Sequence, residues 1–433
     1  MKALLLLGYL LVTALRFSLD WLNFHYRQRV NKSLPEIFSG QIDEERLRNS
    51  DAYALAGDKL GFVEDMVGVG LTLWFLFGGL LPWYDRLIAG LTDHFILQGL
   101  LFFGLLALVQ LLIGVPFSLY RNFALEERFG FNRMSFKLWC TDLLKSLLVG
   151  IVLFLLLGSG ALWLVQWAPN SWWLWVWGFW ALVSLFLLYL SPYLIEPLFF
   201  KFVPLAKVEL ESAVRDLLEK AGVKAGKVLQ VDASRRSGHS NAYFTGIGKV
   251  KRVVLFDTLM EQLEDQELLA VLAHELGHWR CGHLRQQLVK SQLVAMFSCG
   301  LAFFLLKSNL LPGWFGLEQL SFAGQVFVLG WLGALVGFFW KPISSWWSRR
   351  HERQADQFAI DMIGSGRELA SGLVKLAREN LSNLFPHPLY TAIYYSHPPL
   401  VERVLWLEKR EPGLIDLAFG KGCAGAEREA QNN

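Results

Sequence analysis

The sequence predicts a mostly α-helical, polytopic membrane protein with about seven transmembrane helices and one water-facing α+β domain. Of its 433 residues, 54% are hydrophobic and only 18% are charged, against about 25% charged residues in soluble proteins. The 33 Phe and 18 Trp exceed what one water-facing core needs, and aromatic side chains collect at membrane interfaces. This composition excludes a disordered chain, a collagen-like chain and a disulfide-rich secreted module.

The charges and the cysteines exclude further classes of protein. The formal net charge is +3, from 41 Lys and Arg against 38 Asp and Glu, whereas a nucleic-acid-binding domain concentrates basic side chains on one face. We therefore expect no nucleic-acid partner. The four cysteines, at positions 140, 281, 299 and 423, include no CxxC pair, so neither a disulfide framework nor a cysteine-based zinc site is predicted.

Each expected span is an apolar run of roughly 20 residues, the length of helix that crosses about 30 Å of hydrocarbon. The seven runs cover about residues 3–21, 67–83, 95–119, 144–167, 172–194, 293–311 and 322–340. The first run could instead be a cleaved signal, because its apolar core is short and ends at Arg16. No clear small-x-small cleavage site follows that core, so we expect a retained span.

The polar segments between the spans predict the orientation in the bilayer. Segments rich in Lys and Arg alternate with segments that hold almost none, and the positive-inside rule places the rich ones in the cytoplasm. With seven spans, the N-terminus is then outside and the C-terminus inside. The two long polar regions, before span six and after span seven, lie on the cytoplasmic side and can fold together, because spans six and seven form one out-and-back hairpin.

This topology predicts a division of the chain into five parts. Residues 1–197 hold spans one to five, 198–291 the first part of the water-facing domain, 292–341 spans six and seven, 342–415 the second part of that domain, and 416–433 a mobile tail. In the first part of the domain, Leu and Val at helical spacing predict a helix over 208–221. Val-rich runs predict strands over 227–233 and 250–256, and residues 264–290 are expected to form one long helix.

The long predicted helix carries the pattern H-E-x-x-H at His274, Glu275 and His278. Residues four apart share one face of a helix, so the two imidazoles can converge on one cation. Two His and one acidic ligand suit Zn²⁺ and leave a fourth tetrahedral position open for water. Glu275, beside the first ligand, can take a proton from that water. The pattern predicts one catalytic zinc ion; the alternative is a solvent-exposed helix with two unrelated histidines.

The third ligand has to come from elsewhere in the chain. Glu352 and Asp356 are four apart on a helical pattern after span seven, on the same side of the membrane as His274 in the predicted topology. One carboxylate can bind zinc while the other orients a ligand imidazole, and Glu352 is the better candidate for the metal. A helix that continues through His283 would point this residue away from the metal, which favours a place behind the ligands or at the surface. Cys281 is expected to be an ordinary helix residue.

Two further segments carry polar candidates. Asn241, in the turn-rich stretch SGHSNAYFTG before a predicted strand, could hydrogen-bond a substrate backbone, with an ordinary hairpin turn as the alternative. His397 comes just before a pair of prolines, which would break any helix and hold the His on a rigid turn. With Arg403 nearby, His397 could stabilise a developing oxyanion.

The motifs, taken in chain order, resemble those of the type I CAAX prenyl proteases, a family of seven-span membrane zinc metalloproteases. The resemblance covers roughly residues 115–410. The segments that carry it are RNFALEERFGFN, SPYLIEPLFFKFVPL, SNAYFTG, HELGHWRCGH, ERQADQF and SHPPLVER. Because order and topology match as well as the motifs, this resemblance is far more specific than H-E-x-x-H alone.

The resemblance implies a fold and an activity. Seven helices would surround a large water-filled chamber, capped by a cytoplasmic, gluzincin-like α+β protease domain. The strand near 250–256 would pair with a substrate peptide as an added strand. In eukaryotes the family removes the last three residues from prenylated C-terminal Cys motifs, so the implied partners are a peptide or protein substrate and the lipid bilayer.

The resemblance also implies roles for individual residues. One zinc ion would be bound by His274, His278 and Glu352, with Glu275 as the general base and Asp356 bracing a ligand His. Three more residues match family positions near the substrate backbone and the oxyanion: Asn241, His397 and Arg403.

The short loop between spans six and seven, without a long soluble insertion, is typical of bacterial relatives. We therefore favour the bacterial inner membrane, with the endoplasmic reticulum membrane as the location if the source is eukaryotic. Bacteria generally lack protein prenylation, so quality-control cleavage of unprenylated membrane-associated polypeptides is the alternative activity. A non-enzymatic scaffold or transporter with a structural metal is less favoured, because structural zinc sites are closed by four protein ligands and only three candidates are found here.

Overall fold

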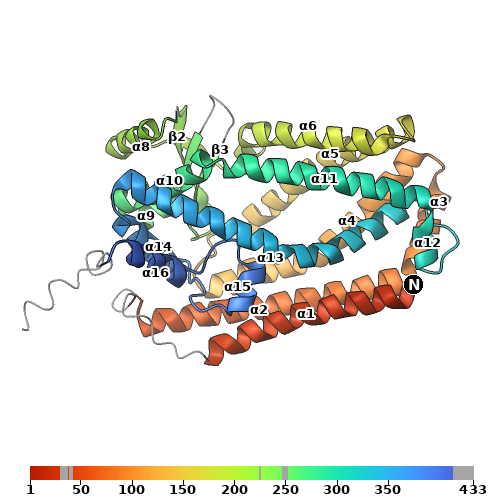
Figure 1. Ribbon diagram of the computed structural model, residues 1–433, viewed down its shortest axis with the longest axis horizontal. Helices are drawn as coiled ribbons and strands as arrows, with labels where there is room; N and C mark the ends of the chain where they lie inside the picture. Colours follow the sequence, from red (N-terminus) through yellow and green to blue (C-terminus); the bar gives the residue numbers. More distant parts are fainter. Residues whose placement is uncertain (30–37, 39–41, 224–225, 246–251, 413–433) are drawn as a thin grey trace, which may run out of the picture.

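The computed structural model describes residues 1–29, 38, 42–223, 226–245 and 252–412. Long helices run along its longest axis, and the strands gather at one end with most of the short helices (Figure 1). The tail expected over 416–433 and the first two residues of the strand expected over 250–256 lie outside the described residues. The predicted mostly α-helical architecture is confirmed.

Within the described residues, seven helices are long and apolar enough to cross a membrane, as predicted. They are α1 (Lys2–Arg29), α2 (Glu44–Thr72), α4 (Phe95–Tyr120), α5 (Phe136–Trp167), α6 (Trp172–Leu194), α11 (His283–Ser308) and α13 (Phe322–Ile363). In the most apolar 18-residue window of each, at most 17% of the residues are buried inside the chain. Leu182 and Phe186 of α6, for example, are 68% and 56% exposed. Lipid covers such a surface at no hydrophobic cost, whereas water would oppose it by about 25 cal/mol per Å².

The second span differs from its predicted bounds of about 67–83. Its helix begins far earlier, at Glu44, and ends in a π-helical segment, η2 (Leu73–Phe77). Gly78 and Gly79 then break the helix, and Gly79 has a φ of 88°, a left-handed conformation that favours glycine. A separate helix, α3 (Leu80–Leu91), follows. Hydropathy alone misses this break, because the residues on both sides of it are apolar.

An apolar cluster closes the end of the molecule opposite the sheet. It joins α3 to α12 (Leu310–Trp314) and to the membrane helices between them (Figure 1). Leu81, Phe102 and Leu311, one from each of α3, α4 and α12, are completely buried there. The Tyr84 hydroxyl donates to the carbonyl of Phe102 at 2.6 Å, which ties α3 to α4.

A four-stranded sheet lies at the other end of the molecule. Its strands are β1 (Phe202–Pro204), β2 (Lys227–Val231), β3 (Ala242–Thr245) and β4 (Arg252–Phe256), in the order β1-β2-β4-β3, with β2 and β4 parallel and the outer pairs antiparallel. The helical elements of this end are η3 (Arg121–Glu126), α7 (Glu196–Phe199), α8 (Val208–Lys220), η4 (Ala233–Arg235), α9 (Asp257–Gln262), α10 (Asp265–Arg280), α14 (Arg367–Glu379), α15 (Pro388–Tyr394) and α16 (Leu400–Arg410).

The sheet order overturns one expectation. The strand near 250–256 was expected to pair with a substrate peptide, but β4 already has a neighbour on each side: β2 in parallel and β3 in antiparallel register. Both backbone edges of β4 are therefore used inside the sheet. Among the described strands, β3 is the edge strand on this side, so an added strand would have to pair with β3.

The helix expected over 264–290 is also divided in the structure. α10 ends at Arg280 and α11 begins at His283. Gly282, between them, has a φ of 70°, the left-handed conformation in which glycine commonly ends a helix. The chain therefore changes direction directly after the H-E-x-x-H motif, and α11 enters the membrane region as a separate helix.

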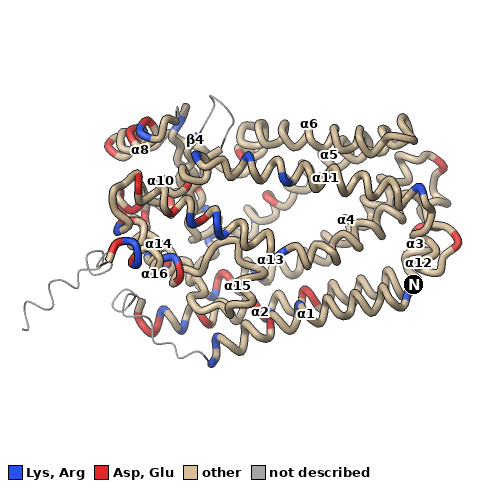
Figure 2. Tube along the Cα trace, viewed as in Figure 1, with Lys and Arg blue, Asp and Glu red and all other residues tan. Residues whose placement is uncertain are grey.

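The parts of the chain before and after the α11–α13 hairpin share one apolar core. Val214 of α8, Leu255 of β4 and Leu272 of α10 are completely buried in it, together with Ala370 of α14 and Leu407 of α16. Lys, Arg, Asp and Glu gather at this end, whereas α4 and α6 carry none (Figure 2). The long helix α13 links the two environments, because it begins among apolar residues and ends inside this core.

Candidate active site

The helix α10 places the H-E-x-x-H motif against the core of the sheet domain. It begins with a capping box, in which the Glu267 carboxylate accepts a hydrogen bond from the backbone N–H of Glu264 at 2.9 Å. Leu268, Leu272 and Leu276 are at most 1% exposed and fix one face of the helix in the core. The polar motif residues follow the same helical spacing along a neighbouring face.

Close packing between α10 and α13 brings the histidines of the motif together with the acidic candidates. A Cβ atom on Gly277 would lie 2.9 Å from the Cα of Ala355 and 3.2 Å from the Cβ of Phe358. Only glycine allows this approach, because real Cβ contacts are longer. The motif histidines flank Gly277 on α10, and the acidic candidates flank Ala355 on α13.

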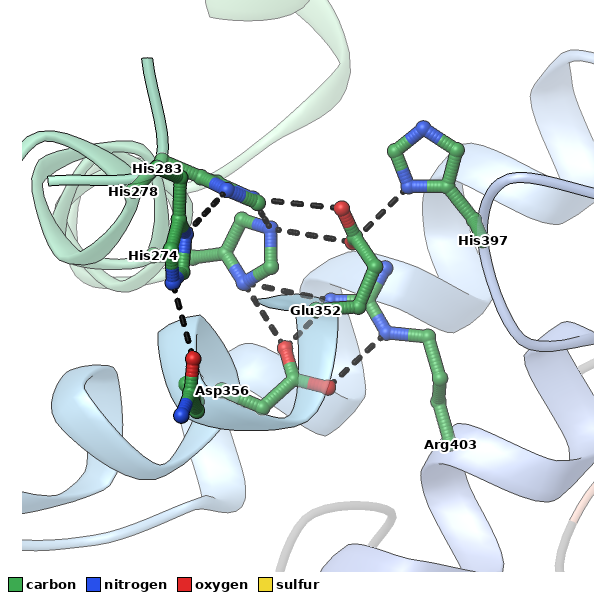
Figure 3. A network of polar contacts seen from close by, with 8 residues as sticks. His274, His278, His283, Glu352, Asp356, His397 and Arg403 are labelled. Carbon is green, nitrogen blue, oxygen red and sulfur yellow. Dashed lines mark hydrogen bonds and ion pairs between the residues drawn. The ribbon is translucent and has the colours of Figure 1, made fainter. Parts of the chain in front are cut away.

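Three possible metal ligands meet at this contact (Figure 3). The Nε2 atoms of His274 and His278 are 3.2 Å apart. The Glu352 carboxylate places Oε1 3.2 Å from Nε2 of His278 and Oε2 3.4 Å from Nε2 of His274. The two histidines come from α10, before the membrane hairpin, and Glu352 comes from the last part of α13, the second helix of that hairpin.

This group of donor atoms fits a zinc ion. Ligand atoms about 2.0–2.2 Å from tetrahedral Zn²⁺ stand roughly 3.3–3.5 Å from one another, close to the 3.2–3.4 Å found here. Glu352 is buried, and its Oε2 accepts no well-aligned hydrogen bond from the described residues, although two imidazoles lie near it. A buried carboxylate oxygen without a hydrogen bond is costly unless a cation compensates it.

Asp356 and Arg403 lie directly behind His274 (Figure 3). Nδ1 of His274 is 2.8 Å from the Asp356 carboxylate, which Arg403 binds with both Nε, at 3.0 Å, and Nη2. Burial alone would lower the pKa of His274, but the carboxylates of Asp356 and Glu352 outweigh it and raise this pKa to about 9. The site therefore stabilises positive charge at the place where the ligand atoms meet.

The Arg403 side chain is only 10% exposed. Burial opposes its charge, but the Asp356 carboxylate outweighs this and raises the pKa of Arg403 above its usual value. A fixed, buried guanidinium that binds one carboxylate with two donors is suited to hold Asp356 in place.

His278 has a different partner behind it. Its Nδ1 is 3.0 Å from Nδ1 of His283, and Nε2 of His283 is 2.9 Å from Oε1 of Gln354. The imidazole of His283 is buried, at 4% exposure. Of the two places expected for His283, the structure shows the buried one, behind the candidate ligand His278, and not the surface.

His397 lies at the open side of the site. Its Nδ1 is 2.8 Å from Oε2 of Glu352, and its side chain is 63% exposed. The predicted break at the proline pair is confirmed, because α15 ends at Tyr394 and α16 begins at Leu400. Arg349 of α13 donates to the carbonyl of Tyr395 at 2.8 Å and so holds this turn against the helix that carries Glu352.

Glu275 and Asn241 complete the set of predicted residues. Glu275 is half-buried on α10, and its charge contributes to the raised pKa of Arg403. Asn241 is exposed directly before the edge strand β3, and its Oδ1 accepts from the backbone N–H of Ala242 at 2.8 Å. Its backbone carbonyl accepts from Phe256 N–H at 3.2 Å, which fixes the start of the edge strand.

Comparison with known proteins assigns the chain to a family. A family model described as "CAAX prenyl protease N-terminal, five membrane helices" matches residues 23–201, and "Peptidase family M48" matches residues 204–411. CAAX prenyl protease 1 of Saccharomyces cerevisiae is 33% identical over 427 residues, which cover 91% of this chain and 93% of that protein. The chain belongs to the CAAX prenyl protease family of M48 peptidases.

Other relatives support the same family assignment for this M48 peptidase. A CAAX prenyl protease 1 homolog of Arabidopsis thaliana is 34% identical over 86% of the chain and 89% of that protein, and one of Homo sapiens is 32% identical over 86% and 87%. The crystal structure of S. mikatae Ste24p has a TM-score of 0.83 at 30% identity, covering 93% of this chain and 99% of that one. The predicted family is confirmed, and the M48 peptidase is a multi-pass integral-membrane metalloprotease of the CAAX prenyl protease type.

Two contacts at the M48 peptidase site were missed: that of His283 with the candidate ligand His278, and that of Gln354 with His283. Gln354 was not singled out, and the link from His283 to His278 was not predicted. Gly282 carried a signal, because glycine often ends a helix, and a helix that stops before His283 no longer points this residue away. No pattern identified Gln354, since it is an exposed residue on a long polar helix face.

Proposed function

We propose that the chain is a zinc endopeptidase, with His274, His278 and Glu352 as ligands of one zinc ion. The observation that carries this proposal is the group of three donor atoms 3.2–3.4 Å apart. Bound zinc would polarise a peptide carbonyl and lower the pKa of a bound water toward neutrality. Three protein ligands leave a position open for that water, as expected of a catalytic rather than a structural site.

Glu275 is proposed to act as the general base. It follows the first ligand on α10, so its carboxylate belongs to the same turn of helix as His274. Its function is to accept a proton from the attacking water and pass it to the leaving amine. It has a role distinct from Glu352, whose carboxylate lies between the two ligand imidazoles and His397.

His397 and Arg403, which the sequence grouped together, are proposed to act in different places. His397 is largely exposed beside Glu352 and can donate an N–H to the oxyanion that develops on a substrate carbonyl. Arg403 is buried and binds Asp356. We therefore assign Arg403 a positioning role through Asp356 and His274 rather than a contact with substrate.

The edge strand β3 is proposed to bind the substrate backbone. An extended peptide can add to a sheet edge by main-chain hydrogen bonds, and β3 is the edge strand that contacts α10. The side-chain Oδ1 of Asn241 accepts a hydrogen bond from Ala242, and its amide N–H groups can donate to a substrate carbonyl. This arrangement would lay the scissile bond beside the metal ligands.

The substrate class is proposed from the relatives. Proteins named CAAX prenyl protease 1 match over most of their length, which favours removal of the C-terminal tripeptide from a prenylated Cys motif. Cleavage of unprenylated membrane-associated polypeptides is the second candidate, favoured by the short connection between α11 and α13. A chamber between the membrane helices stays a prediction.

The membrane side and the source are likewise proposals. The gathering of charged residues at the sheet end (Figure 2) and the Lys- and Arg-rich segments favour a cytoplasmic protease domain. The shared core supports one domain built from 198–291 and 342–415, interrupted by the hairpin of 292–341. The compartment is the bacterial inner membrane, or the endoplasmic reticulum membrane if the source is eukaryotic.

A cleavage assay in detergent tests the proposal. A farnesylated CAAX peptide and its unprenylated counterpart are incubated with purified protein, with and without a zinc chelator and with zinc restored. We expect release of the tripeptide from the farnesylated peptide, its loss on chelation and its return with zinc. Cleavage that resists complete metal removal would overturn the zinc mechanism, and equal cleavage of both peptides would favour the second substrate class.

A further inference from the structure

His283 lies behind His278, the second of the two proposed histidine ligands. We propose that His283 is a positioning residue that accepts the Nδ1–H of His278 and thereby keeps Nε2 of His278 deprotonated toward the metal. The inference rests on the proposed metal site. It gives a role to a histidine that is not one of the three proposed ligands.

The fold brings His283 back to the site by a sharp turn. α10 ends after Arg280, and Gly282 takes the left-handed conformation that allows the chain to change direction. His283 then begins α11 with its ring buried, and its Nδ1 lies 3.0 Å from Nδ1 of His278 (Figure 3). A continuous helix would have carried His283 to a different face.

The direction of the hydrogen bond follows from ligation. A neutral imidazole has one N–H and one lone pair, so if Nε2 of His278 binds the metal, its proton is on Nδ1. The neighbouring nitrogen of His283 must then accept. This requires the proton of His283 to be on its Nε2, where an acceptor is needed in turn.

Gln354 supplies that acceptor. Its Oε1 lies 2.9 Å from Nε2 of His283, so the order of donors runs from His278 to His283 to Gln354. The reverse order would put a proton on Nε2 of His278, between Nε2 of His274 and Oε1 of Glu352. That tautomer cannot bind a metal through Nε2, so only one direction of this chain is compatible with the site.

A stacked ring fixes the plane of His283. The rings of His283 and His351 are parallel to within 8°, with centroids 3.9 Å apart. Nε2 of His351 accepts from the indole N–H of Trp347 at 2.7 Å. The acceptor atom for His278 is thus held in place from two directions, by stacking and by Gln354.

The two histidine ligands are therefore held by different chemistry. His274 has a carboxylate behind it, Asp356, whose charge Arg403 balances. His278 has a neutral imidazole. A carboxylate partner increases the basicity of a ligand imidazole more than a neutral acceptor does, so His278 is the weaker donor of the pair and the one whose affinity depends on His283.

Substitutions at position 283 separate the hydrogen bond from packing. In His283→Phe the ring can still stack but has no acceptor. In His283→Asn an acceptor oxygen occupies the place of Nδ1, because both atoms are bonded to Cγ. Loss of such a partner typically weakens metal affinity by about 10–100-fold. We expect this loss in His283→Phe, an affinity within about threefold of wild type in His283→Asn, and the highest affinity in His283→Asp.

The readout is zinc affinity, measured by competition with a chelating dye, together with the absorption spectrum of the Co²⁺-substituted protein. His239→Phe is the matched control, because His239 is also stacked on a ring, that of Phe131, but its polar contacts are with Tyr53, Glu126 and Asn380 rather than with a ligand. Its zinc affinity should be unchanged. Equal affinities in wild type, His283→Phe and His283→Asn would overturn the inference.

Gln354, the exposed last residue of the hydrogen-bonded series His278–His283–Gln354, gives a second test that does not disturb packing. Gln354→Glu keeps an acceptor opposite Nε2 of His283, whereas Gln354→Lys places a donor there and opposes the required direction. We expect the zinc affinity of Gln354→Glu to be at least equal to that of the wild type, and that of Gln354→Lys to be lower than that of the wild type. The reverse order would overturn the inference. If zinc binding by the wild-type protein did not depend on Glu352, the proposed function itself would fail. If zinc binding depended on Glu352 but was unaffected by substitutions at position 283, only the present inference would fail.

Discussion

Gly277 of α10 packs directly against Ala355 of α13, so closely that a Cβ on the glycine would lie 2.9 Å from the alanine Cα. The contact lies between the histidine pair on one helix and the acidic pair on the other. The distance between these backbones therefore fixes the distance between the nitrogen and oxygen atoms of the candidate metal site.

Gly277→Ala should push α10 away from α13. Overpacking of this kind commonly destabilises a protein by about 1–3 kcal/mol, and we expect a lower Tm together with weaker zinc binding. Gly337→Ala on α13 is the control, since a Cβ there meets no atom within 4 Å. A Gly277→Ala protein with wild-type zinc affinity would show that the helix contact does not set the site.

Glu352→Ala should remove most of the bound zinc, because one of three ligands is lost, whereas Glu275→Gln should keep zinc and lose peptide cleavage. Elemental analysis of the purified proteins and the peptide assay measure the two effects. Full zinc content in Glu352→Ala would contradict the ligand assignment. Unchanged turnover in Glu275→Gln would remove this residue from the proton transfer.

Arg403→Met should leave the Asp356 carboxylate buried without its cation. Removal of one partner of a buried ion pair typically destabilises by about 3–5 kcal/mol, seen as a lower Tm. Adding Asp356→Asn should recover part of the Tm without restoring zinc affinity, because the brace of His274 is still lost. If the double variant were no more stable than Arg403→Met, the buried charge would not be the cause.

His239 predicts a pH dependence of stability. Its hydrogen bond to Glu126 raises its pKa above the usual value, against burial, which lowers it, with Asn380 adding to the rise. The stability that it contributes is fully present below the unfolded pKa of about 6.5 and is lost as pH rises through the higher folded pKa. Between pH 6 and pH 8, the wild-type Tm should therefore fall more than that of His239→Gln. Equal changes in the two proteins would contradict this linkage.

The sequence was sufficient for features that depend on neighbours along the chain. Seven apolar runs predicted seven long apolar helices, because the membrane selects for continuous hydrophobicity over about 20 residues. The i, i+4 spacing placed His274 with His278 and Glu352 with Asp356 on common helix faces. The break before α16 followed from the prolines, whose rings cannot continue a helix.

The features that were wrong or missed depend on backbone conformation at single glycines or on distant contacts. Gly79 divides a run that is apolar on both sides, and Gly282 divides the stretch that was expected to form one helix over 264–290. The sheet order, with β4 inside and β3 at the edge, is not encoded in the composition of either strand, because both are mostly apolar. The ion pair between Arg403 and Asp356 was missed, because it depends on where the tertiary fold places α16.

The sequence alone determined which helices form, which of them are apolar enough to span a membrane and which residues could bind a metal, since these follow from periodicity and residue chemistry. Only the tertiary structure decided that α10 and α13 touch through Gly277, that three donor atoms meet there, and that His278 is braced by His283 while His274 is braced by Asp356. Those relationships arise from packing between segments far apart in the chain, where no local pattern records the distance or direction of a side chain.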